Sequence, residues 1–205
     1  MIAVDTLVLD LGNVLVPWHP ERAFDGLVGP EEVQRFFGDV DFPELNRTLD
    51  GGRDWADARR ELAARGPWYA RMLDLYVANF PRTLGGEVPG MAQLVAELHA
   101  LGLRLLGLTN WSAATFHHAV PAAPAIGLLE DVVVSGREGV SKPDPRIFAL
   151  LVQRFGLEPT TTLFVDDSAT NVAAARAAGL RAVVFSGAAR LRADLRSRGV
   201  PVAAA

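Results

Sequence analysis

Four short polar segments of this sequence carry side chains suited to acid–base, metal-binding and anion-binding chemistry. They are Asp10, the pair Thr109-Asn110, the segment Ser141-Lys142-Pro143 and the pair Asp166-Asp167. Three of these side chains are carboxylates, which cannot all ionise at one place without a compensating cation. A hydroxyl, an amide and an ammonium beside a hard cation suit an anionic substrate, with phosphate the natural candidate. One carboxylate could then attack phosphorus and form a covalent acyl phosphate.

Each polar segment lies at or soon after the end of an apolar run that is typical of a buried parallel strand. Such runs cover residues 6–10, 103–108, 131–134, 162–165 and 181–185. Helical spacing of apolar residues lies between them, over residues 91–100, 144–155 and 169–178. This alternation predicts an α/β fold with a doubly wound, Rossmann-like parallel sheet. Ligands of such sheets bind at the carboxyl ends of the strands, where the polar segments lie.

The stretch after the first strand has a different character. It lacks a convincing strand, and its helical candidates cover residues 31–37, 55–64 and 68–80. We therefore expect a catalytic core of residues 1–16 and 85–205 and a small helical cap, residues 17–84, inserted after strand one. The cap is rich in aromatic residues, and most of these are expected to form its own core. They include Trp18, Trp55, Trp68 and Tyr69.

Composition narrows the class of protein. The chain has 205 residues, a net charge of -4 and no cysteine. These values argue against nucleic acid as a partner and exclude disulfide, thiolate-metal and cysteine-nucleophile chemistry. The sequence shows neither a signal peptide nor a membrane span, so we expect a cytoplasmic protein without a membrane partner. Lys142 is the only lysine among 20 basic residues, which suggests a site that requires an ammonium rather than a guanidinium.

The four segments, taken in order, resemble the motifs of the haloacid dehalogenase-like hydrolase superfamily. They read Asp10-Leu11-Gly12-Asn13-Val14-Leu15, Leu108-Thr109-Asn110, Ser141-Lys142-Pro143-Asp144-Pro145 and Val165-Asp166-Asp167-Ser168. The first motif is most similar to that of small phosphatases of the glucose-1-phosphate phosphatase type. The resemblance covers about residues 4–16 and 88–187, and the cap resembles the family only in length and helicity.

The resemblance implies a catalytic role for two residues and phosphate binding by three. Asp10 matches the nucleophile. Lys142 matches the residue that steadies this nucleophile and binds phosphate. Thr109 matches a second phosphate-binding residue, and Asn110 matches the amide beside its hydroxyl.

The resemblance also implies a Mg²⁺ site and one supporting residue. Its ligands would be Asp10, the backbone carbonyl of Gly12, Asp166 (directly or through water) and Asp167. Asn171, one turn along the following helix, matches a supporting polar position.

One position departs from the usual phosphatase pattern of the superfamily. Most of these phosphatases carry a second aspartate two residues after the nucleophile as the general acid and base, and Gly12 occupies that position here. General acid–base catalysis contributes about 10²- to 10⁴-fold in rate. His19 lies near in sequence, and histidine is a common general acid and base in enzymes. We favour a loop position for His19, so the replacement group stays open.

These features predict a Mg²⁺-dependent phosphatase of a small phosphorylated metabolite, acting through an aspartyl phosphate as a monomer or homodimer. A sugar phosphate is one candidate substrate. Two alternatives are a 2-haloacid dehalogenase of the same fold, in which Asp10 would attack carbon, and a non-catalytic binding protein. The Asp166-Asp167 pair counts against the dehalogenase, since unneutralised acids would repel an anionic substrate. The intact Asp10, Lys142 and Asp167 count against the binding protein.

Overall fold

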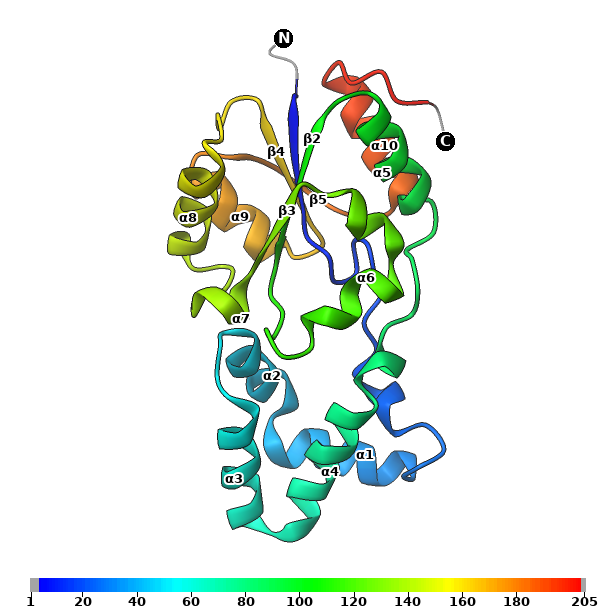
Figure 1. The fold of residues 1–205 in the computed structure, drawn as a ribbon, viewed down its shortest axis with the longest axis vertical. Helices are drawn as coiled ribbons and strands as arrows, with labels where there is room; N and C mark the ends of the chain where they lie inside the picture. The colour runs from blue at the N-terminus through cyan, green and yellow to red at the C-terminus, as the bar shows by residue number, and fades with distance from the viewer. Residues whose placement is uncertain (1–3, 204–205) are drawn as a thin grey trace.

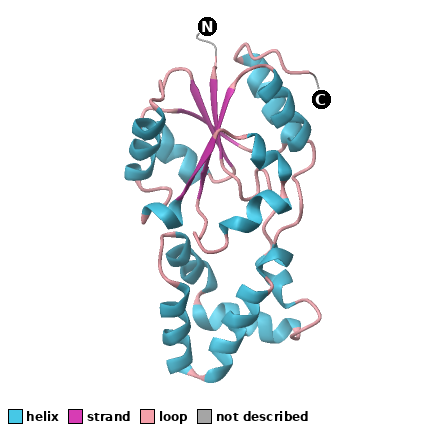
Figure 2. Ribbon diagram, in the orientation of Figure 1, coloured by secondary structure: helices cyan, strands magenta, loops and turns pink. Residues whose placement is uncertain are grey.

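A computed structural model describes residues 4–203 of the protein. Its core is a five-stranded sheet in which every neighbouring pair is parallel, in the order β3-β2-β1-β4-β5 (Figures 1 and 2). The strands are β1 (Thr6–Leu9), β2 (Arg104–Thr109), β3 (Asp131–Val134), β4 (Thr162–Asp166) and β5 (Arg181–Val184). The predicted α/β class and parallel sheet are confirmed.

Helices cover both faces of this sheet, because successive strand residues point to opposite faces. Leu7 and Leu9 of β1 belong to one buried cluster, whereas Val8 between them belongs to another. The first cluster includes residues of α5 (Met91–Ala100) and α10 (Ala188–Ser197), and the second those of α8 (Pro145–Phe155) and α9 (Ala169–Ala177). Figure 1 shows these two helix pairs on opposite sides of the sheet, as a doubly wound fold requires.

The carboxyl ends of the strands meet at one edge of the sheet. Leu9 pairs with Gly107 of β2 and with Val165 of β4. Asp10 therefore follows at the level of Leu108 and Asp166, so strand register alone gathers residues of three motifs. Shorter helices connect the strands here: η3 (Phe116–His118), α6 (Ala119–Ala122) and η4 (Pro124–Leu128) lie between β2 and β3, and α7 (Ser135–Glu138) follows β3.

The segment between β1 and α5 forms the helical cap, below the sheet in Figure 1. Its elements are η1 (Pro20–Phe24), α1 (Pro30–Val40), α2 (Phe42–Asp50), α3 (Trp55–Arg65), α4 (Pro67–Ala78) and η2 (Phe80–Thr83). Three of the α-helices match the sequence prediction, but α2 was missed. None of the helices within residues 4–203 has the length and apolar character needed to cross a membrane.

The cap has an aromatic core of its own. Tyr76 of α4 is fully buried, and its ring lies 5.1 Å from that of Phe42 and 6.3 Å from that of Phe24. Phe36 of α1 packs against Phe24 at 6.1 Å. Edge-to-face and tilted pairs of this kind stabilise a small helical unit beyond the area that they bury.

Two chain segments side by side join the cap to the core, and we call them the neck (residues 15–19 and 83–88). The His19 amide donates to the Thr83 carbonyl at 2.8 Å, and the Gly85 amide donates to the Pro17 carbonyl at 2.9 Å. Trp18 and Leu84 pair as an isolated antiparallel bridge. These backbone bonds fix the entry and exit of the cap relative to each other.

Candidate active site

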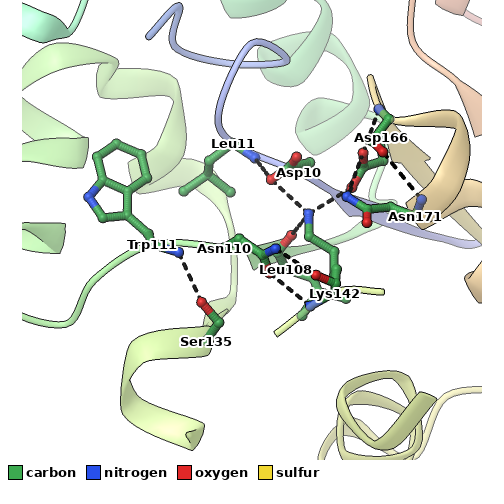
Figure 3. A network of polar contacts seen from close by, with 10 residues as sticks. Asp10, Leu11, Leu108, Asn110, Trp111, Ser135, Lys142, Asp166 and Asn171 are labelled. Carbon is green, nitrogen blue, oxygen red and sulfur yellow. Dashed lines mark hydrogen bonds and ion pairs between the residues drawn. The ribbon is translucent and has the colours of Figure 1, made fainter. Parts of the chain in front are cut away.

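Lys142 lies at the centre of a buried polar network at the carboxyl edge of the sheet (Figure 3). Its Nζ atom is 2.9 Å from Asp10 Oδ1 and 2.7 Å from Asp166 Oδ2, and it donates to the Leu108 carbonyl at 2.9 Å. The Lys142 side chain has no solvent exposure. An ammonium has three donors, and all three have partners here. This geometry gives a physical reason for the one lysine in an arginine-rich chain.

Asn110 holds the backbone of Lys142 from two sides. Its Nδ2 donates to the Lys142 carbonyl at 2.8 Å, and its Oδ1 accepts from the Lys142 amide at 2.9 Å. Asn110 also lines the pocket described below. The sequence predicted that Asn110 binds phosphate, but the structure commits its amide group to positioning Lys142. Direct phosphate binding by Asn110 stays a prediction.

Asp166 is fully buried, and hydrogen bonds surround its carboxylate. Besides Lys142, it accepts from the Ser168 amide at 2.8 Å and from Asn171 Nδ2, which lies 3.1 Å from each oxygen. Asn171, for which the sequence predicted a supporting role, thus contacts both oxygens of this carboxylate. Because both oxygens of Asp166 are engaged, this residue is better placed to orient Lys142 than to bind a metal through a free oxygen.

Asp10 presents a different arrangement, with one oxygen fixed. Oδ1 accepts from the Leu11 amide at 2.7 Å and contacts the Lys142 ammonium. Within residues 4–203 no hydrogen bond engages Oδ2. Burial raises the pKa of Asp10 to about 7, the Lys142 charge acts against this rise, and the nearby Asp166 charge adds to it. A further positive charge at this site would favour the ionised form.

Three carboxylates could share such a charge. Asp10, Asp166 and Asp167 each have an oxygen within 4.8 Å of one another. Burial raises the pKa of Asp167, and the charge of Asp166 raises it further, whereas a hydrogen bond from the Asn13 side chain lowers it. The single positive charge of Lys142 cannot neutralise three carboxylates. A set of donors that are all oxygen atoms fits a hard divalent cation. Asp10, Gly12 and Asp167 line the pocket and would hold such a cation.

Thr109 shows an unsatisfied group at the same edge. The residue is buried at the end of β2, and its Oγ1 has no hydrogen-bond partner within the described chain. A buried hydroxyl without a partner costs about 1–3 kcal/mol. An oxygen of a bound phosphate would provide the missing partner.

A pocket of about 160 Å³ opens between this edge and the cap. Its core wall comprises Asp10, Gly12, Asn13, Asn110, Trp111 and Asp167, and the cap and neck supply Trp18, Asn46, Asp50 and Phe80. Sequence reasoning assigned no site role to Asn13, Asn46, Asp50, Phe80 or Trp111. Asn46 and Asp50 are four residues apart and share a face of α2, a signal that becomes readable once that helix is recognised.

The aromatic residues of the cap divide between two environments. Trp18 lines the pocket, so it is not simply cap core. Trp68 packs against Phe36 at 6.1 Å and against Tyr69 at 4.9 Å, as expected for cap core. Trp55 lies between the two units, since its Nε1 donates to Ser112 Oγ of the core at 2.7 Å.

His19 does not line the pocket in which the missing acid would act. It lies in the neck, 40% exposed, with Nδ1 3.8 Å from Glu21 Oε1, and it is not among the pocket-lining residues. The preferred loop position for His19 therefore agrees with the structure.

Asp50 is the acidic residue of the cap that lines the pocket. Its Oδ2 accepts from Asn46 Nδ2 at 2.8 Å, and the backbone of Ser112 in the core also hydrogen-bonds this carboxyl group. Burial raises the pKa of Asp50 to about 7 and the charge of Asp10 adds to the rise, while the Ser112 and Asn46 bonds oppose it.

Comparison with known proteins agrees with this geometry. The model of the haloacid dehalogenase-like hydrolase family matches residues 4–179. A phosphoglycolate phosphatase of Chromobacterium violaceum is 30% identical over 212 residues, which cover 94% of this chain and 91% of that protein.

Two solved structures show the same fold at lower identity. A haloacid dehalogenase family enzyme of Bacteroides thetaiotaomicron, in complex with magnesium and inorganic phosphate, has a TM-score of 0.65 at 19% identity, covering 90% of this chain and 95% of that one. The L-2-haloacid dehalogenase of Xanthobacter autotrophicus has a TM-score of 0.66 at 20% identity, covering 95% and 81%. The family model spans most of the chain, and the sheet, the motifs and the buried lysine agree with it. The chain therefore belongs to the haloacid dehalogenase-like hydrolases.

Proposed function

We propose that this hydrolase is a Mg²⁺-dependent phosphatase of a small phosphorylated metabolite, with Asp10 as its nucleophile. The observation that carries the proposal is the state of the Asp10 carboxylate. Lys142 and the Leu11 amide fix Oδ1, whereas Oδ2 has no hydrogen bond within the described residues and Asp10 lines the pocket. The phosphatase relative supports the same chemistry.

The reaction would proceed in two displacements at phosphorus. Asp10 Oδ2 attacks phosphorus, the bond to the leaving oxygen breaks, and an aspartyl phosphate forms. Water then attacks phosphorus, and the bond to Asp10 breaks. Lys142 holds the nucleophile in place, and the Thr109 hydroxyl donates to a phosphate oxygen. A divalent cation bound by Asp10, Asp167 and the Gly12 carbonyl would offset the negative charge of the phosphate.

The pocket favours an uncharged leaving group. Among the described residues that line it, none is arginine, lysine or histidine, whereas Asp50 and Asn46 form part of its cap wall. A carboxylate on the leaving group would find no cationic side chain among these residues to pair with it. We therefore expect a polyol or sugar phosphate to be a better substrate than phosphoglycolate, although relatives carry the latter name.

The dehalogenase alternative fits the site less well. A 2-haloacid brings its own carboxylate, which would approach Asp10, Asp166 and Asp167 with only Lys142 to balance them. The resemblance in structure to a dehalogenase is at 20% identity and shows the fold alone.

The direct test is hydrolysis of p-nitrophenyl phosphate by the purified chain, with Mg²⁺ and after treatment with a chelator. We expect turnover with Mg²⁺, at least about 100-fold less after chelation, and recovery when Mg²⁺ is restored. Full activity in the chelated protein would refute metal dependence. Halide release from 2-chloropropionate without phosphate release would favour the dehalogenase instead.

A further inference from the structure

The leaving oxygen of an alkyl phosphate needs a proton, and Gly12 has no side chain to supply it. Three residues that line the pocket can exchange a proton, namely Asp10, Asp50 and Asp167. Asp10 is the proposed nucleophile, and Asp167 belongs to the proposed cation site. Asp50 belongs to neither, and it lines the pocket on the cap side.

The position of Asp50 suits protonation of a leaving group. Phosphoryl transfer places the leaving oxygen roughly opposite the attacking one. Asp10 attacks from the core, so the leaving group points toward the cap wall, which Asp50 helps to form. A carboxyl group on that wall lies on the side where the bond breaks.

The surrounding groups hold this carboxyl group in place. On its own helix, Asn46 Nδ2 donates to Oδ2 at 2.8 Å, and from the core the Ser112 backbone reaches the same group. Ser135 Oγ of α7 donates to the carbonyl of Asp50, which anchors the end of α2 to the core. Positioning of this kind is what an effective proton donor needs.

Burial favours the protonated form of Asp50 near neutrality, and the charge of Asp10 favours it further. Two titratable groups interact with the Asp50 carboxyl group. Asp10 at the end of β1 raises its pKa, and the hydroxyl of Tyr76 on α4 is neutral at that pH. The polar neighbours are Asn46 and Ser112. None of the residues found to influence this carboxyl group is a cation.

We propose that Asp50 of the cap is the general acid and base of the reaction, in place of the aspartate that Gly12 lacks. The inference rests on the proposed phosphatase function. As Asp10 attacks, the electron pair of the breaking P–O bond goes to the leaving oxygen, which takes the Asp50 proton. In the second displacement, the Asp50 carboxylate takes a proton from the attacking water as the aspartyl phosphate breaks. Both residues return to their starting states.

The test compares two substrates whose leaving groups differ in their need for a proton. p-Nitrophenyl phosphate releases a stable phenolate, whereas glycerol 2-phosphate releases an alkoxide. We expect Asp50→Asn to lower kcat/KM for glycerol 2-phosphate by about 10²- to 10⁴-fold, and that for p-nitrophenyl phosphate by a clearly smaller factor. The matched control is Asp54→Asn. Asp54 is exposed and caps α3 by accepting from the Ala56 amide at 2.7 Å, and asparagine caps equally well.

The pH profile gives a second readout. With glycerol 2-phosphate, wild-type kcat/KM should fall as pH rises above about 7, because Asp50 loses its proton. Asp50→Asn should abolish that decline. Asn46→Ala should move it to higher pH, since the Asn46 bond lowers the pKa of Asp50.

Each outcome bears on a different claim. Equal fold losses on both substrates in a folded Asp50→Asn protein would make Asp50 structural, and unchanged kcat/KM values on both substrates would remove it from the reaction. If Asp50→Asn does not fold, an unshifted decline in Asn46→Ala overturns the inference and a shifted one supports it. If the wild-type protein hydrolyses neither substrate, the proposed phosphatase function fails, and the inference fails with it.

Discussion

The core and the cap bring residues to the same pocket by different routes. In the core, Asp10, Thr109 and Asp166 lie where buried strands end, and parallel pairing gathers them. In the cap, Asn46 and Asp50 reach the pocket through the packing of α2 against the core. Strand register therefore positions the functional side chains of the core, whereas side-chain contacts position the cap against the core. Core substitutions should stop the chemistry on every substrate, whereas cap substitutions should act on the binding or the protonation of the leaving group.

Replacing the nucleophile gives the largest effect expected in the core. Asp10→Asn keeps the shape of the side chain but removes its nucleophilicity, so we expect kcat for p-nitrophenyl phosphate to fall at least about 100-fold. The measurement is steady-state kinetics on protein whose circular dichroism matches the wild type. Substantial turnover in this variant would place the nucleophile elsewhere and would break the division between core and cap.

Lys142→Arg should be nearly as damaging as Lys142→Ala. The Lys142 side chain has no exposure, and its three partners lie within 2.9 Å of Nζ. A guanidinium carries the same charge but is wider and planar, so it should displace Asp10 or the phosphate. We expect a loss of about 10²-fold in kcat/KM, measured for both variants on one substrate. Near-wild-type activity in the arginine variant would mean that composition alone explains the single lysine.

The core could be predicted from the sequence because its functional residues lie at the ends of apolar strands. The apolar runs predicted all five strands, and their polar ends predicted the edge at which Asp10 and Asp166 meet. The pairing of Asn110 with the backbone of Lys142 was not readable, because it joins residues 32 positions apart through side-chain geometry. The amide could be assigned to the site but not to its partner.

The cap was harder to predict from the sequence. The helix α2, which was not predicted, carries Asp50, which was not assigned to the site. The helix α2 begins beside Asp41, which adopts a left-handed conformation, and Pro43, so the segment resembles a loop. Its buried residues Phe42, Leu45 and Leu49 have helical spacing that could have revealed it. Even then, nothing local shows that the face with Asp50 meets the pocket, because packing of the cap on the core decides it.

Weakening the contact between the cap and the core should have a moderate effect on KM. Trp55→Phe keeps an aromatic ring beside Tyr76 but removes the hydrogen bond to Ser112. Such a bond contributes about 0.5–1.5 kcal/mol, so we expect KM to rise about 2- to 12-fold with kcat changed less. The control is Trp68→Phe, within the cap, which should leave KM unchanged. A fall in kcat at constant KM would indicate that the cap contact acts on the chemistry itself.

The smallest expected effect concerns stability and returns to Asp50. Its folded-state pKa of about 7 lies above the ordinary value of 3.8, so the folded protein binds the proton more tightly than the unfolded chain. The resulting stability is present at low pH and is lost as pH rises through about 7. Asp50→Asn cannot ionise and should therefore gain stability relative to wild type between pH 5 and pH 8.

Thermal unfolding across that pH range measures this difference. Because Asp50 keeps some solvent exposure, we expect a relative gain of about 1 kcal/mol, or roughly 2–4 °C in Tm for a chain of this size. Asp10 titrates in both proteins, so the difference isolates Asp50, and Asp54→Asn should follow the wild-type curve. Parallel curves for wild type and Asp50→Asn would mean that the cap acid is ionised at neutral pH in the folded protein. The cap would then bind the leaving group without supplying its proton, and the core alone would perform the chemistry.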